Sequence, residues 1–206
     1  MKATVAVLLA MAVSATAFAG EPVTDTTKIV ALSGRFSMAQ ACPVSPYLAL
    51  TAGHVVDPSP FNMGVSLLPY MGQSAVWQGI VQGLRTYWTM DLAWAFPDTD
   101  FPSWYELGSE PKAGERLWWV GYDWRNAKRG FERRLFSGEV TRSVAGTLFI
   151  DAETYPGSSG SCVLNAEGKV VGIISAVTGM ESQEPVVMVV GVWAPWFKLP
   201  TDEEVK

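Results

Sequence analysis

The chain has 206 residues, of which 49% are hydrophobic and 17% are charged, with one histidine and a formal net charge of −5. This composition supplies enough apolar surface for a sizeable core and excludes a wholly disordered protein. The acidic balance argues against a general binder of nucleic acid or of anionic membranes, which needs a basic surface. A single histidine also excludes metal sites that require two, such as the H-E-x-x-H zinc motif.

The first 19 residues have the pattern of an export signal. Lys2 is basic, residues 5–13 are apolar, and an Ala-Phe-Ala triplet with the form of a cleavage site ends at Ala19. The apolar run is shorter than the about 20 residues that a bilayer span requires, which argues against a membrane-spanning helix. An uncleaved membrane anchor is the alternative interpretation. We expect cleavage after Ala19, a short tail over residues 20–27, and a secreted or periplasmic protein without membrane contact once the signal is removed.

Beyond the signal, short apolar runs alternate with turn residues. The runs are rich in valine, isoleucine and aromatic residues and are bounded by glycine, proline, serine or aspartate, which is typical of strands. They include Lys28–Ser33, Tyr47–Thr51, Leu92–Phe96, Leu117–Tyr122, Thr147–Ile150, Lys169–Ala176 and Val186–Trp193. No window has a sustained helical period, although a short helix could follow Ala194-Pro195. The chain is therefore predicted to be all-β, as barrels or sandwiches.

A polar, turn-rich stretch from Gly108 to Gly114 lies near the middle of the chain and is the best candidate for a domain boundary. We expect one domain over residues 28–107, a linker over residues 108–113 and a second domain over residues 114–200. Residues 201–206 would form a C-terminal tail.

Two segments carry a candidate base and its partner. His54 follows a strand-like run that ends in Ala52-Gly53, and these small residues leave the imidazole uncovered. A neutral imidazole is the usual general base near pH 7. Asp91 opens an apolar strand, where a partly buried carboxylate needs a hydrogen-bond partner such as an imidazole N–H. Taken alone, each is more simply interpreted as an ordinary surface, core or turn residue.

The third segment is Pro156–Ser161, in which glycines flank a pair of serines. A serine on a tight glycine-rich loop can present its hydroxyl, although such loops are also common without a function. The order His54, Asp91, Ser159 is that of a chymotrypsin-type triad. The α/β-hydrolase order is excluded because it places histidine last, and the G-x-S-x-G motif fails at Ser161.

These segments resemble the trypsin/chymotrypsin superfamily of serine proteases, most of all its compact bacterial branch of Deg-type periplasmic proteases and glutamyl endopeptidases. The motifs are T-A-G-H at 51–54, D-L-A at 91–93 and G-S-S-G-S at 157–161, and the resemblance runs from about Ile29 to Phe197. The family implies two antiparallel β-barrels of six strands each, with the site in the cleft between them. It implies that Ser159 is the nucleophile, His54 the base and Asp91 the residue that orients the base.

The resemblance also assigns substrate contacts. The N–H groups of Gly157 and Ser159 would form the oxyanion hole, and Ser175 would bind substrate backbone and support the aspartate. The pocket beside the nucleophile would involve Glu153, Thr154, Ala176 and Val177. Glu153 would favour a basic substrate side chain, whereas Val177 would narrow the entrance and favour small or medium apolar side chains, the preference that we expect.

Cys42 and Cys162 are the only cysteines, and neither belongs to a C-x-x-C motif. An exported protein with two cysteines can hold one structural disulfide, and two buried thiols are the alternative. In the family, the segment of Cys42 packs beside the nucleophile loop. The resemblance therefore favours a Cys42–Cys162 bond that joins the two barrels near the site.

The sequence thus predicts an exported, monomeric serine endopeptidase that cleaves protein or peptide substrates through an acyl-enzyme. No metal, other cofactor or nucleic-acid partner is expected. Two alternatives stay open: a catalytically silent binding protein on the same fold, and a protease dedicated to a single substrate.

Overall fold

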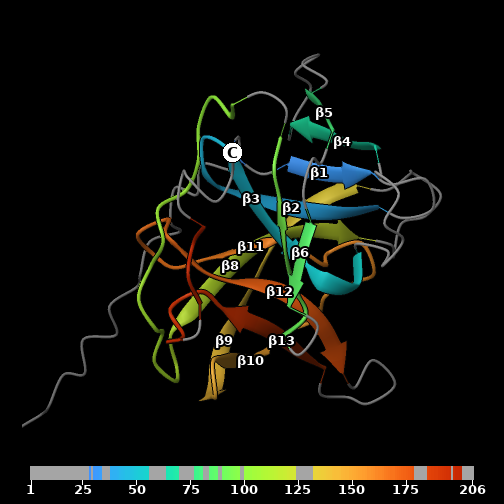
Figure 1. The fold of residues 1–206 in the computed structure, drawn as a ribbon. Helices are drawn as coiled ribbons and strands as arrows, with labels where there is room; N and C mark the ends of the chain where they lie inside the picture. Colours follow the sequence, from blue (N-terminus) through green and yellow to red (C-terminus); the bar gives the residue numbers. More distant parts are fainter. Residues whose placement is uncertain are drawn as a thin grey trace, which may run out of the picture.

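The computed structural model describes residues 28, 30–33, 38–55, 64–69, 77–80, 84–87, 90–97, 100–123, 132–178, 185–195 and 197–200. The predicted export signal and both predicted tails, residues 1–27 and 201–206, lie outside these residues. The described part is built almost entirely of antiparallel β-strands, which form two bodies, one above the other in Figure 1. None of its helices is long and apolar enough to cross a membrane.

The N-terminal body is a sheet with the strand order β5-β4-β1-β2-β3-β7-β6. Its strands are β1 (Val30–Ser33), β2 (Met38–Ser45), β3 (Leu48–Ala52), β4 (Gly64–Pro69), β5 (Trp77–Ile80), β6 (Leu84–Tyr87) and β7 (Leu92–Ala95). β2 pairs with β1 through its first half and with β3 through its second, with an irregular register between Pro43 and Ser45. The described strands number seven, one more than expected for the first barrel.

The C-terminal body is a closed barrel with the order β10-β13-β12-β11-β8-β9, which confirms the expected six-stranded barrel. Its strands are β8 (Arg116–Asp123), β9 (Glu132–Val144), β10 (Thr147–Asp151), β11 (Cys162–Leu164), β12 (Val170–Thr178) and β13 (Val186–Gly191). β10 shows why such a segment becomes a strand: Leu148 and Ile150 are fully buried, whereas Thr147 before them and Phe149 between them are not. This alternation places every second side chain in the barrel core.

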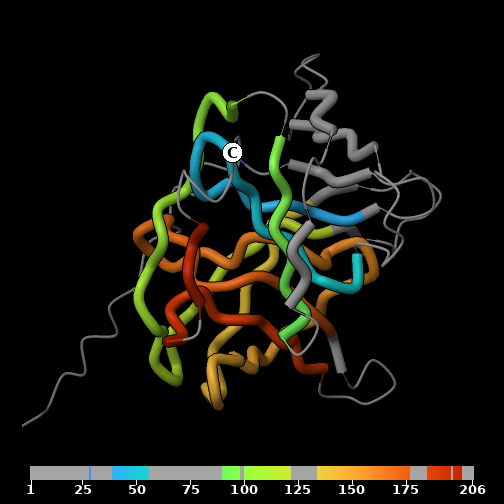
Figure 2. The backbone as a smooth tube through the Cα atoms, in the orientation of Figure 1, coloured from blue at the N-terminus to red at the C-terminus, as the bar shows by residue number. Residues whose placement is uncertain are grey.

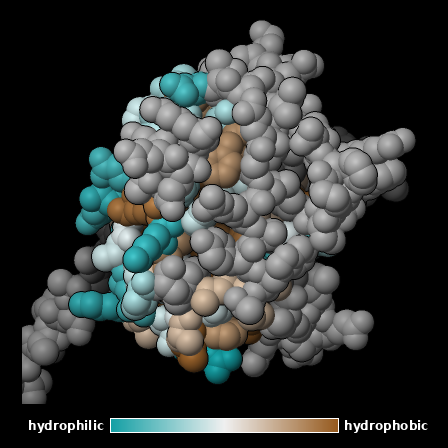
Figure 3. All heavy atoms as spheres, in the orientation of Figure 1, coloured by the Kyte–Doolittle hydropathy of each residue, from teal (hydrophilic) through white to brown (hydrophobic). Residues whose placement is uncertain are grey.

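Among the described residues, two clusters of buried side chains organise the interior. One fills the C-terminal barrel around Trp119, and the other joins Leu50 and Leu92 of the first body to Val120 and Ile173 of the second. Large exposed apolar residues are few in the described part, namely Trp104, Leu135 and Val144. Hydrophilic and hydrophobic residues lie side by side in the coloured part of the face in Figure 3. The two bodies therefore share a continuous apolar core.

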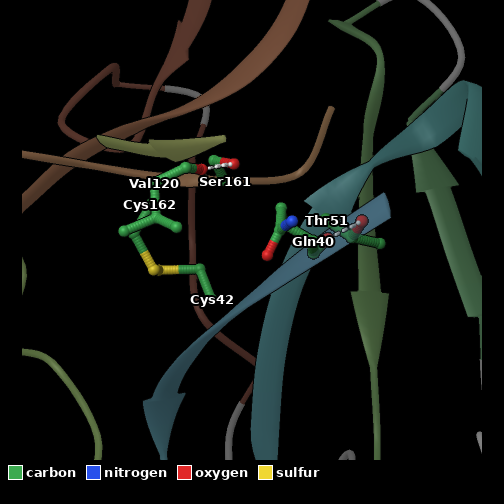
Figure 4. The surroundings of a disulfide bond; sticks show 6 residues. All are labelled: Gln40, Cys42, Thr51, Val120, Ser161 and Cys162. Carbon is green, nitrogen blue, oxygen red and sulfur yellow. Dashed lines mark hydrogen bonds between the residues drawn. A yellow bond between two sulfur atoms is a disulfide. The ribbon is translucent and has the colours of Figure 1, made fainter. Parts of the chain in front are cut away.

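Two further connections hold the bodies together. Cys42 of β2 and Cys162 of β11 form a disulfide with a Cα–Cα distance of 5.1 Å, as the resemblance implied (Figure 4). The segment between β7 and β8 runs along both bodies, drawn in green to yellow-green in Figure 2. The Phe101 N–H donates to the Pro46 carbonyl at one end, and the Gly108 N–H donates to the Val170 carbonyl at the other.

The short helix considered after Ala194-Pro195 is not formed by described residues 197–200. A single turn closes where the Phe197 N–H donates to the Ala194 carbonyl at 2.8 Å, and residues 197–200 then follow without regular structure. Leu199 precedes Pro200, and proline disfavours the helical conformation in the residue before it.

Candidate active site

His54 is positioned by the end of β3. The strand stops at Ala52, and Gly53–Val55 forms a 3₁₀ turn packed against the backbone of Asp91. The Gly53 N–H donates to the Asp91 carbonyl at 2.9 Å, and a Cβ on residue 53 would lie 3.1 Å from the Asp91 carbonyl carbon. A glycine at position 53 thus allows the close approach, and it leaves the His54 side chain 51% exposed.

Asp91 meets His54 because β7 pairs with β3, with Leu92 opposite Ala52. Its φ of 47° lies in the left-handed region, which aspartate tolerates better than most residues. The carboxylate accepts a hydrogen bond from the His54 backbone N–H at 2.7 Å and lies 2.9 Å from Nδ1 of the imidazole. The carboxylate therefore holds both the backbone and the ring of His54.

Ser159 comes from the loop between β10 and β11 of the other body. Its Oγ lies 2.9 Å from Nε2 of His54. The loop turns sharply at Gly157 and Gly160, whose φ values of 92° and 84° are readily adopted only by glycine. The structure thus brings the three sequence-predicted residues together in one hydrogen-bonded chain, Asp91–His54–Ser159.

Two backbone N–H groups of this loop make no hydrogen bond to any described residue. The N–H groups of Ser158, Gly160 and Ser161 donate to the carbonyls of Tyr155, Ile174 and Ser158, at 3.1, 2.8 and 3.0 Å. The N–H groups of Gly157 and Ser159 donate to none of the residues that the structure describes. Because backbone donors at such a site need a partner, these two N–H groups are available to a bound ligand.

The charges at the site favour an imidazole that takes up a proton. The hydrogen bond to Asp91 raises the pKa of His54; burial lowers it, but the negative charge of Asp91 adds to the rise, and the net pKa lies above the usual 6.5. Burial raises the pKa of Asp91, but hydrogen bonds from His54 and Ser175 and the charge of His54 outweigh it, so that the net pKa is lowered. Asp91 therefore stays ionised beside a base of increased affinity for protons.

The other predicted site residues divide into two groups. Ser175 of β12 donates its hydroxyl hydrogen bond to Asp91, so it joins the three residues above. Thr154 is buried, and its Oγ1 accepts a hydrogen bond from Nε1 of Trp119 at 3.3 Å. Glu153 is exposed and accepts a hydrogen bond from the Tyr155 hydroxyl at 2.8 Å. Neither Glu153 nor Thr154 hydrogen-bonds to the Asp91–His54–Ser159 chain.

Position 176 is exposed on β12 beside Ser175, and the side chain of Val177 lies outside the described residues. Sequence reasoning missed Gln40, which donates hydrogen bonds to both Ser159 and Gly157. The available signal was a polar residue inside a strand-like run, two positions before Cys42 and hence on the same strand face. No group of three or more His, Cys, Asp or Glu side chains suited to a metal ion occurs among the described residues.

The model of the trypsin-like peptidase domain matches residues 38–173. The chain belongs to the trypsin-like peptidase family. The matched region contains His54, Asp91 and Ser159 and spans both bodies. A search of the curated proteins finds no significant match.

Solved structures support the same fold. A Glu endopeptidase in complex with MPD has a TM-score of 0.67 and 19% identity, over 84% of this chain and 89% of the other. Rv3671c from M. tuberculosis, in an inactive form, has a TM-score of 0.64 and 17% identity, over 84% and 88% of the two chains. A serine endoprotease from Yersinia pestis has a TM-score of 0.64 and 17% identity, over 81% and 59%. The expected trypsin/chymotrypsin-like serine protease fold is thereby confirmed.

Proposed function

We propose that this trypsin-like protease is an endopeptidase that cleaves peptide bonds in protein substrates through a covalent acyl-enzyme on Ser159. One observation carries the proposal: Ser159 Oγ, His54 Nε2, His54 Nδ1 and the Asp91 carboxylate form an unbroken hydrogen-bonded chain with contacts of 2.9 Å at both ends of the imidazole. A nucleophilic serine needs a base within such reach, and the base needs an orienting group.

In the first half of the reaction, Ser159 Oγ attacks the carbonyl carbon of the scissile peptide, and its proton passes to Nε2 of His54. The C–N bond then breaks, and His54 returns the proton to the leaving amine. Asp91 keeps the remaining imidazole proton on Nδ1 and stabilises the imidazolium that forms between the two steps.

In the second half, water adds to the acyl carbon while His54 takes one of its protons. The bond to Ser159 Oγ breaks, the proton returns to that oxygen, and the carboxylic acid product leaves. Both halves pass through a tetrahedral oxyanion. The N–H groups of Gly157 and Ser159, which have no partner among the described residues, are the donors that we propose for this oxyanion, each worth about 3–4 kcal/mol in comparable enzymes.

The substrate preference that we propose is for small or medium apolar side chains next to the cleaved bond. Glu153 is exposed, and its carboxylate accepts a hydrogen bond from Tyr155. A carboxylate in contact with water selects weakly for a basic side chain, because water screens its charge. Profiling cleavage sites in a proteome-derived peptide library tests this preference; a dominant cleavage after lysine or arginine would assign the selection to Glu153 instead.

Export is a further part of the proposal. The pattern of residues 1–19 and the disulfide support it, because disulfides persist in oxidising compartments. Expression of the full chain followed by N-terminal sequencing tests it. A mature protein that begins after Ala19 is the expected result, and an intact N-terminus in the membrane fraction would favour the uncleaved anchor.

The decisive experiment is labelling of the folded protein with a fluorophosphonate probe. We expect one adduct, located on Ser159 by mass spectrometry, and none in His54→Ala or Ser159→Ala variants that retain the wild-type fold. A folded wild-type protein that resists the probe would favour a silent binding protein on the same fold. Labelling without hydrolysis of casein or of a peptide library would favour a protease dedicated to one substrate.

A further inference from the structure

Gln40 of β2 is an unusual residue for its surroundings. It is fully buried, and among the largest fully buried side chains of the described residues it is the only one with a carboxamide. The side chain lies on the same strand face as Cys42, which is bonded to the second body (Figure 4). A buried amide costs free energy unless its polar atoms are hydrogen-bonded, so its partners should explain why it is there.

Two of those partners are backbone carbonyls of the nucleophile loop. The Gln40 backbone N–H donates to the Ser159 carbonyl at 2.9 Å, and its side-chain Nε2 donates to the Gly157 carbonyl at 3.4 Å. One residue of the N-terminal body thus binds both residues whose N–H groups have no partner in the described part of the chain. The side-chain contact spans 117 positions in the sequence.

We infer that Gln40 is a positioning residue, which holds Gly157 and Ser159 so that both N–H groups point at one reacting oxygen. This inference rests on the proposed function. Glycine rotates about its backbone bonds at low cost, so the peptide groups on either side of Gly157 can adopt several orientations. Each peptide group is planar, so the hydrogen bond to the Gly157 carbonyl fixes the plane of the 157–158 peptide. The Cα atoms of Gly157 and Ser158 join that peptide to the two peptides that carry the Gly157 and Ser159 N–H groups, so fixing it limits how both can rotate. The Gln40 side chain thus selects one orientation of the peptide that follows this glycine.

Gln40 also connects the nucleophile loop to the segment that carries the base. The Thr51 hydroxyl donates to the Gln40 carbonyl at 2.8 Å, and Thr51 precedes His54 by three residues. A Cβ on residue 160 would collide with the Gln40 carbonyl oxygen and with Thr51 Oγ1, so the loop lies directly on these two residues. The Gln40 backbone and side chain therefore fix the position of the nucleophile loop relative to the end of β3, which carries His54.

Gln40→Met tests the side-chain contact, because methionine has nearly the same shape but no donor, and the backbone N–H remains. Gln40→Asn is the second variant, which keeps the carboxamide but shortens its reach by one methylene group. Ile150→Val is the matched control, a small deletion in the core of the C-terminal barrel at a residue without a hydrogen bond to Asp91, His54 or Ser159. Urea unfolding establishes that each variant is folded before kinetics are measured with a peptide substrate.

We expect kcat to fall by about 10- to 100-fold in both Gln40 variants with KM changed less than about threefold, because transition-state contacts are lost while substrate binding remains. Ile150→Val should keep the wild-type kcat. A Gln40→Met variant with wild-type kcat would overturn the inference. So would a loss that appears only in KM, because the side chain would then act on substrate binding.

A second readout does not depend on activity. With glycine carbonyl-¹³C and serine ¹⁵N labelling, only the peptides 108–109, 157–158 and 160–161 give signals, because the chain has three Gly-Ser pairs. In Gln40→Met we expect the 157–158 signal to shift or broaden and the 108–109 signal to stay. An unchanged 157–158 signal would overturn the inference. A wild-type protein without turnover contradicts the proposed function instead, while this signal still reports whether Gln40 orders the loop.

Discussion

Ser159 Oγ lies 2.9 Å from Nε2 of His54 although 105 positions separate the two residues in the sequence. Each belongs to a different β-body, so the contact exists only when the two bodies are held in one relative position. The disulfide, the shared apolar core and the hydrogen bonds of Gln40 fix that relative position beside the site. Chemistry at this site therefore depends on the junction of the bodies as much as on the residues themselves.

Removal of either reacting residue should abolish turnover without unfolding the protein. We expect Ser159→Ala and His54→Ala each to lower kcat by about 10⁶-fold, by analogy with triad knockouts in other serine proteases. The double variant should be no worse than either single variant, since the two residues act as one unit. Kinetics with a peptide substrate and urea unfolding measure the two properties separately. Additive losses in the double variant would argue against a shared proton-transfer step.

The value of kcat/KM should depend on the protonation state of His54 and should be highest when its imidazole is neutral. Because the base must be neutral and its pKa lies above the usual 6.5, kcat/KM should rise with pH through an apparent pKa above that value. Asp91→Asn removes the hydrogen bond and the charge that raise the pKa of His54, so the rising limb should move to lower pH while the maximum rate falls steeply. A limb at the same pH in both proteins would assign the titration to another group.

Stability should change in the opposite direction over the same interval. A raised folded-state pKa means that the stabilising pair of protonated His54 with Asp91 is complete below about pH 6.5 and is lost as pH rises through the folded pKa. The lowered pKa of Asp91 means that its contribution is present above about 3.8 and is lost as pH falls through the folded value. Urea unfolding of wild type and His54→Ala across this range isolates the contribution. A wild-type minus variant difference that grows above pH 7 would contradict this sign.

Ser175 should act on the reaction through Asp91. Its hydroxyl donates to the carboxylate and helps to keep the pKa of Asp91 low. A hydrogen bond to a charged group contributes about 1.5–3 kcal/mol, so Ser175→Ala should lower kcat/KM by about tenfold or more. Ser175→Thr, which keeps the hydroxyl, should restore most of the rate if the added methyl group fits. Equal losses in both variants, with unfolding free energies like that of wild type, would assign the effect to a contact other than this hydroxyl.

Strands with an apolar, β-branched pattern were predictable from the sequence. The runs Leu92–Phe96 and Lys169–Ala176 correspond closely to β7 and β12. β9 was missed because its residues are mostly polar or charged, and in the described part several of them face solvent along the hairpin with β8. β9 is one of the six barrel strands and is held there by backbone pairing with its sequence neighbours β8 and β10, which does not require an apolar side-chain pattern.

At the site, residue order and the single histidine predicted which side chains would meet. The contacts of Gln40 and of Trp119 with the loop before Ser159 were not predictable, because both arise from tertiary packing over long separations. The Cys42–Cys162 pairing was predictable in part. Two cysteines allow only one intramolecular bond, but the resemblance to a known family was needed to favour bond formation over two buried thiols.

The disulfide should stabilise the protein mainly by restricting the unfolded chain. It closes a loop of 120 positions, for which chain entropy predicts about 4–5 kcal/mol, and measured losses on removal are typically about 2–5 kcal/mol. We expect reductant to lower the free energy of unfolding in urea by such an amount, and a Cys42→Ala/Cys162→Ala variant to show no dependence on reductant.

Both sulfurs belong to fully buried residues, so the native protein should resist reduction until it unfolds. Alkylation under native conditions with reductant, followed by mass measurement, checks this. Rapid modification without loss of structure would mean that the bond opens locally, and with Cys162 three residues after Ser159 such opening should then lower kcat as well.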